Sequence, residues 1–99
     1  MADSNSPLVL SGAKVVTTAG TAVALGSRKV RAITIQAKIA NTGVIYVGGS
    51  DVDSSTNAGL NPGDQLYLEA DKGPPLDLAA LFIDSSVDAE GVDYYAIKA

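Results

Sequence analysis

Short segments of alternating apolar and polar residues, separated by closely spaced turn residues, constrain the fold of this chain most. The clearest segment covers residues 29–38, where Ile33, Ile35 and Ala37 alternate with polar side chains. A period of two places these three residues on one face of an extended strand and their polar neighbours on the other. The segment is therefore predicted to be a half-buried β-strand.

The same pattern recurs along the chain, and no segment shows convincing helical periodicity. Further strands are predicted at 13–18, 21–25, 44–47, 65–70, 76–83 and 92–97. Residues 76–83 fit a helix or a strand by pattern alone, and the two prolines before them favour a strand. The Asn-Thr-Gly turn at 41–43 predicts a hairpin between 29–38 and 44–47. Pro62-Gly63 predicts a type II turn.

These strands predict an all-β fold made of seven to eight short strands. The arrangement is either an antiparallel β-sandwich or a small jelly-roll-like barrel. We expect the last strand to return beside an early one, as in a Greek key. Residues 1–12, whose first part is rich in Ser, Asn, Asp and Pro, are predicted to form a flexible N-terminal arm. Residues 13–99 are predicted to form a single β-sandwich domain, because 99 residues are enough for one core.

The composition excludes several kinds of chemistry. The chain has no Cys, His or Trp. Disulfides, thiolate or imidazole metal sites and catalytic triads built on histidine are therefore impossible. We predict that the protein is not an enzyme, with no catalytic residues, no cofactor and no metal.

Two acidic segments, 84–91 and 51–55, leave an alternative open. Their carboxylates could hold Ca²⁺ through oxygen ligands, but neither segment has the ligand spacing of an EF-hand loop. The simpler interpretation is a solvated turn in both places.

Charge bears on possible partners. The net charge is −4, which argues against nucleic acid as a partner, because binding to phosphates needs basic side chains. Residues 1–50 carry one acidic and five basic side chains, whereas residues 51–99 carry ten acidic and two basic ones. This division fits either complementary patches between copies or ordinary solvated loops. The sequence shows no membrane-spanning run and no export signal, which predicts synthesis in a cytoplasm.

Two groups of residues are candidates for contact with a partner. The arm ends in three apolar residues that could dock on a partner or on the domain itself: Leu8, Val9 and Leu10. The tyrosines, which suit either an interface or the edge of a core, are Tyr46, Tyr67, Tyr94 and Tyr95. Tyr94 and Tyr95 are adjacent in a predicted strand and should lie on opposite faces.

Several segments together resemble a known family of proteins. They are 19–25 (AGTAVAL), 41–48 (NTGVIYVG), 59–64 (GLNPGD), 81–84 (LFID) and 91–94 (GVDY). Their order resembles small β-rich virion proteins of tailed bacteriophages, in particular capsid decoration (cement) proteins. The resemblance covers about residues 15–97 and carries no catalytic residues.

The resemblance implies a structural function in the virion. A decoration protein is made in the host cytoplasm, binds the major capsid protein on the outer capsid surface as an oligomer, expected to be a homotrimer, and stabilises the head. The alternatives are a structural module of the tail, baseplate or fibre, and a carbohydrate- or receptor-binding β-sandwich. Few aromatic residues are present to form a sugar platform, which weighs against the last of these.

Overall fold

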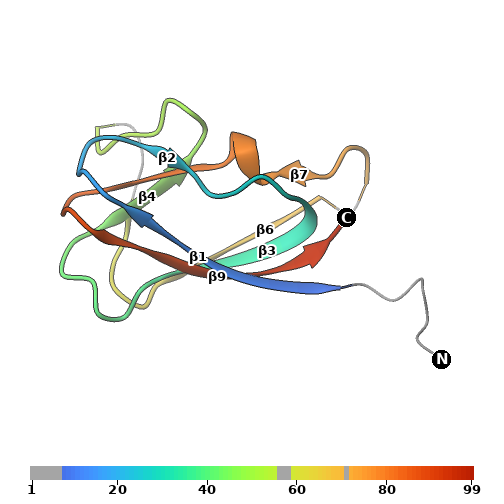
Figure 1. Cartoon of the computed structure of the whole chain (residues 1–99), viewed down its shortest axis with the longest axis horizontal. Helices are drawn as coiled ribbons and strands as arrows, with labels where there is room; N and C mark the ends of the chain where they lie inside the picture. Colours follow the sequence, from blue (N-terminus) through green and yellow to red (C-terminus); the bar gives the residue numbers. More distant parts are fainter. Residues whose placement is uncertain (1–7, 56–58, 71) are drawn as a thin grey trace.

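The computed structural model describes residues 8–55, 59–70 and 72–99, and its regular elements in these ranges are β-strands and one short 3-10 helix (Figure 1). In chain order they are β1 (Val9–Val16), β2 (Val23–Ala24), β3 (Lys29–Ala37), β4 (Ile45–Gly48), β5 (Gly59–Leu60), β6 (Gln65–Glu69), β7 (Leu76–Asp77), the 3-10 helix η1 (Leu78–Ala80), β8 (Phe82–Ser85) and β9 (Glu90–Lys98).

The strands form two antiparallel sheets that pack face to face. Sheet A has the order β1-β9-β3-β6, and β7 pairs with β3 beside β6. Sheet B has the order β2-β8-β4-β5. The predicted all-β sandwich is confirmed, and β9 lies between β1 and β3 as the expected return of the last strand. The barrel alternative is wrong, because the two sheets stay separate and do not close on each other.

The core lies between the two sheets. Sheet A directs Ile33, Ile35 and Ala37 inward from β3, on the one face that their alternation predicts. The other core residues are Val16, Leu25, Val30, Ile45, Leu78, Ile83, Val92 and Ala96. Each fully buried Val, Leu or Ile side chain contributes about 1.5–3 kcal/mol relative to its exposed state. This packing fixes which face of sheet A is left outside.

A β-bulge in β3 sets the alternation of that strand. Val30 pairs with Lys98 and Ala32 pairs with Ile97, so Arg31 is an extra residue with no counterpart on β9. As a result, Val30 and Ile33 both reach the core although their positions differ in parity. The Arg31 guanidinium donates hydrogen bonds to the carbonyl oxygens of Ala70 (3.0 Å) and Gly73 (2.8 Å), which tie the chain after β6 to the bulge.

Two predictions about local connections are wrong. Residues 29–38 and 44–47 do not form a hairpin, because β9 and β6 occupy both edges of β3, and residues 38–44 carry the chain to sheet B. Residues 76–83 are not one strand, because the chain leaves sheet A after β7, turns through η1 and enters sheet B as β8. The Asp77 carboxylate accepts a hydrogen bond from the Ala79 amide at 2.9 Å and caps η1, whose Leu78 is buried.

The predicted boundary between arm and domain at residue 12 also differs from the structure. Residues 9–12 pair with β9 in the first half of β1, and the Lys98 amide donates a hydrogen bond to the Leu8 carbonyl at 2.9 Å. Backbone pairing therefore extends the domain to the beginning of β1. Residues 1–7 of the predicted arm lie outside the described residues.

The turn at Pro62-Gly63 has the predicted type II form. Gly63 has a φ of 87°, and the Asp64 amide donates a hydrogen bond to the Asn61 carbonyl at 2.9 Å. The Gly63 amide also donates to the Ala37 carbonyl at 2.9 Å. The turn is thus attached to the end of β3 and starts β6 in register beside it.

Candidate functional site

The outer face of sheet A carries three rows of side chains that run across its strands. Because side chains alternate along each strand, the pairing registers bring residues from β1, β9, β3 and β6 into line. The rows are Val9, Ile97, Ala32 and Glu69; Ser11, Tyr95, Thr34 and Tyr67; and Ala13, Asp93, Gln36 and Gln65. Two of these twelve residues are acidic: Glu69 on β6, and Asp93 on β9, whose carboxylate accepts a hydrogen bond from the Lys38 ammonium at 2.6 Å.

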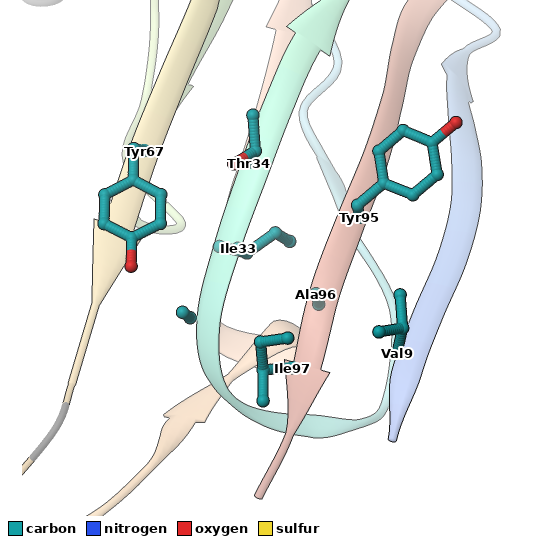
Figure 2. A pocket seen from close by; sticks show the side chains of 8 residues that line it. Val9, Ile33, Thr34, Tyr67, Tyr95, Ala96 and Ile97 are labelled. Carbon is teal, nitrogen blue, oxygen red and sulfur yellow. The ribbon is translucent and has the colours of Figure 1, made fainter. Parts of the chain in front are cut away.

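Tyr67 and Tyr95 stand on either side of Thr34, on the strands that flank β3 (Figure 2). Their exposed fractions are 58% and 64%, respectively. Between and below them is a shallow concavity, here called the tyrosine hollow, lined by Val9, Ala32, Ile33, Thr34, Tyr67, Tyr95, Ala96 and Ile97. Aromatic side chains left this exposed on a regular sheet are typical of contact surfaces.

The size of the tyrosine hollow limits what it can take. Its volume is about 220 Å³. Pockets that enclose small molecules usually measure about 300–1,000 Å³ and bury most of the ligand. A shallow apolar depression below that range fits one or two side chains that a protein partner inserts from outside. The hydroxyl groups of the tyrosines and Thr34 offer hydrogen bonds at its rim.

The predicted contact residues of the arm separate in the structure. Leu8 and Val9 are 58% and 68% exposed, and Val9 lines the tyrosine hollow. Leu10 points the other way and packs against the core. The structure therefore brings Val9 together with Tyr67 and Tyr95, and it does not place Leu10 on the same surface.

The other two predicted tyrosines pack against their own chain. Tyr94 faces inward, on the side of β9 opposite Tyr95 as predicted, and its ring covers Gly12 of β1. A Cβ atom on Gly12 would lie 2.5 Å from the Cζ atom of that ring. Tyr46 is half-buried in sheet B, beside Gly59. Neither residue belongs to the exposed face of sheet A.

The acidic segment 84–91 holds neighbouring loops in place. The Asp88 and Asp84 carboxylates accept hydrogen bonds from the amides of Ala19 (2.7 Å) and Gly20 (3.0 Å), respectively. In the second acidic segment, the Asp53 carboxylate accepts from the Ser55 amide at 2.7 Å. Within residues 8–55, 59–70 and 72–99, no three acidic side chains gather in a way that could hold a metal ion.

Among the acidic residues of segment 84–91, Glu90 accepts the most hydrogen bonds from a neighbouring loop. Its carboxylate accepts hydrogen bonds from the amides of Thr42 (2.7 Å) and Gly43 (2.9 Å) and from the Thr42 hydroxyl (2.8 Å). Desolvation raises the pKa of Glu90, but the three hydrogen bonds outweigh it and hold the pKa below its ordinary value. The turn between β3 and β4 is thus attached to the start of β9.

The sequence alone did not indicate which strand forms an unpaired edge of sheet A. β1 ends sheet A with one edge that pairs with no strand among the described residues. The first half of this strand, residues 9–12, was predicted as part of the arm, and only its second half lay in a predicted strand. No helix in the described part of the chain is long and apolar enough to cross a membrane.

Comparison with protein-family models, with curated proteins and with solved structures finds no match to this chain. The candidate site is therefore defined by its geometry: an exposed sheet face that carries a hollow with a mostly apolar lining, two flanking tyrosines and a neighbouring unpaired strand edge.

Proposed function

We propose that this chain is a bacteriophage structural protein that decorates the outer capsid surface and stabilises the shell by binding the major capsid protein. The observation that carries the proposal is the tyrosine hollow, an exposed aromatic surface on the regular face of sheet A. The resemblance of its sequence segments to small virion proteins supplies the identity of the partner.

The proposed contact has a physical basis in the exposed side chains. Val9, Tyr67 and Tyr95 would lose most of their exposed surface against a protein partner, and buried tyrosines often dominate binding energy at interfaces. A face this small binds weakly as a single contact. A capsid offers many identical sites, so an oligomer that engages several of them binds with a much higher overall affinity.

The proposal is tested by adding the purified protein to expanded capsids of the phage that encodes it, prepared without the decoration protein. We expect the wild-type chain to co-sediment with the capsids in hundreds of copies and to raise the temperature at which they break. The double variant Tyr67→Ala with Tyr95→Ala should bind at least tenfold more weakly. A matched control is Ile39→Ala, which removes an apolar side chain that is 78% exposed but does not line the hollow.

Three results would contradict the proposal. One is that the wild-type chain fails to bind expanded capsids. Another is that the tyrosine variant binds as well as the wild type, which would move the contact away from the hollow. The third is that labelled chain appears only on tails or fibres in electron micrographs, which would select the tail-module alternative.

A further inference from the structure

The free edge of β1 is the longest unpaired strand edge in the described structure. The Lys98 amide bonds to the Leu8 carbonyl, so the even-numbered residues of β1 direct their backbone groups toward β9. The odd-numbered residues, Val9, Ser11, Ala13 and Val15, direct their N–H and C=O groups away from β9. These four residues therefore present a row of backbone donors and acceptors at the side of sheet A.

This edge has few of the features that usually prevent strands from pairing with other chains, and the one it carries is the lysine of β1, Lys14. β1 is eight residues long, contains no proline and pairs with β9 in an unbroken register. Its single charged residue, Lys14, projects from the opposite face to Val9 and Val15. The edge at the other side of sheet A is different, because β6 is five residues long and ends at Glu69.

We propose that β1 pairs antiparallel with β1 of a second copy, across a two-fold axis at Gly12, so that the two A sheets form one continuous sheet. In this register Val9 lies opposite Val15 of the second copy, and Ser11 lies opposite Ala13 of the second copy. All four outward-directed residues of each chain then bond across the interface, which gives about eight backbone hydrogen bonds.

A second copy suits this edge because antiparallel pairing of two identical strands is self-complementary. On the outer face, the exposed side chains of Val9 and Val15 cover each other across the axis. On the inner face, Leu10 meets the alkyl stem of Lys14 of the second copy, so the two Lys14 charges do not oppose each other. Gly12 leaves no gap at the axis, because the Tyr94 ring already covers it from within.

The register has a geometric consequence. The two-fold axis stands perpendicular to the joined sheet, so both tyrosine hollows lie on the same face. The self-association does not depend on the proposed capsid function, but it would supply two contact surfaces that point in one direction.

Two double variants at the same positions test both the pairing and its register. Ser11→Lys with Ala13→Lys places like charges opposite each other twice across the axis, whereas Ser11→Lys with Ala13→Glu places opposite charges there. Each variant changes only side chains at two exposed strand positions of the monomer. We expect sedimentation velocity to show a dimer for the wild type and for the Lys/Glu variant. Their dimer dissociation constants should be at least tenfold smaller than that of the Lys/Lys variant.

Cross-linking gives a second measurement of the register, because the wild-type chain contains no cysteine. A mixture of Val9→Cys and Val15→Cys chains should form a cross-linked dimer with a short bismaleimide far faster than either variant alone. Ile39→Cys is the control, because residue 39 lies away from the edge. A mixture of Ile39→Cys and Val15→Cys chains should cross-link no faster than either variant alone.

The proposal is overturned by a monomeric wild-type chain at all concentrations, by a three-chain mass, or by equal behaviour of the two charge variants. None of these measurements contains a capsid. A failure of self-association is thus distinguished from a failure of capsid binding.

Discussion

At the scale of single residues, Ala89 stands out because its backbone adopts a left-handed conformation. Its φ is 62°, and no other non-glycine residue in the described ranges has a positive φ. Its amide donates a hydrogen bond to the Val16 carbonyl at 2.8 Å, which holds the start of β9 against the end of β1. The conformation costs an alanine about 1–2 kcal/mol.

We therefore expect Ala89→Gly to raise the free energy of unfolding by about 0.5–1 kcal/mol, because relief of the strain exceeds the entropy that glycine adds to the unfolded chain. Urea denaturation measures the change. The matched control is Ala13→Gly on the exposed face of β1, which should lower stability by about 0.5–1 kcal/mol. A loss of stability in both variants would contradict the role assigned to the φ of Ala89.

Glu90 predicts how stability depends on pH. Because the hydrogen bonds hold the pKa of Glu90 below its unfolded value, the ionised carboxylate stabilises the fold fully above the unfolded pKa. This contribution is lost as the pH falls through the folded pKa. We expect Glu90→Gln to be less stable than the wild type at pH 7 and the difference to shrink toward about pH 3.

Urea denaturation between these two pH values measures this convergence. Glu69→Gln, on the exposed face of sheet A, is the control for the removal of one negative charge. A constant difference between Glu90→Gln and the wild type over the whole range would show that the lost contact does not depend on ionisation.

The facing of single residues was predictable where it follows from alternation, as for Ile33, Ile35 and the pair Tyr94 and Tyr95. The role of Glu90 was not, because its donors, Thr42 and Gly43, lie on a turn nearly fifty positions earlier in the chain. No local pattern encodes a contact that exists only after two distant turns meet.

At the scale of elements, Gly12 and Tyr94 act as a pair that joins β1 to β9. The two residues are register partners, and the ring of Tyr94 lies where a side chain on Gly12 would be. An aromatic residue that covers a glycine on a neighbouring strand is a known way to stabilise such a pair.

This arrangement predicts that the effect of Gly12→Ala on stability changes sign when Tyr94 is removed. In the wild type we expect a loss of about 1–3 kcal/mol, because the new Cβ displaces the ring. In a Tyr94→Ala background the same change should be neutral or should stabilise by up to about 1 kcal/mol, since alanine suits a strand better than glycine. A double-mutant cycle by chemical denaturation measures the coupling. Additive effects would contradict the contact.

The sequence predicted that the elements are strands, but it predicted their boundaries and irregularities less well. The strand at 29–38 was identified from its alternation, but the bulge at Arg31 was not, because it is a shift in the pairing of β3 with β9, a strand more than fifty residues later in the chain. Residues 76–83 were predicted as one strand because the segment is mostly apolar and follows two prolines. The structure divides them between the two sheets, since Leu78 is drawn into the core at the crossing point.

At the scale of the whole molecule, the sandwich was predictable and the strand order was largely not. Turn spacing and alternation define an all-β chain with one face of each strand buried. Which strands pair depends on contacts between distant parts of the chain, and the short turn at 41–43 favoured a hairpin that the structure does not form. The residues that share the exposed face follow only from the strand order, in which β9 lies between β1 and β3.

If both proposals hold, self-association should determine how strongly the protein binds a capsid. We expect the Lys/Lys variant at positions 11 and 13 to bind expanded capsids about 10²-fold or more weakly than the wild type, because it presents one hollow instead of two. The Lys/Glu variant should bind as the wild type does. Quantitative co-sedimentation measures both. Equal binding by all three chains would show that the hollow acts alone.

The position of β9 in sheet A also bears on how the protein is synthesised. This strand is the last of the described strands to leave the ribosome, yet both β1 and β3 depend on it for backbone pairing. A nascent chain that ends before Glu90 has the facing edges of β1 and β3 open, and such edges favour aggregation. β9 must therefore be synthesised before sheet A can close, and a product truncated before Glu90 lacks the strand that joins the two parts of this surface.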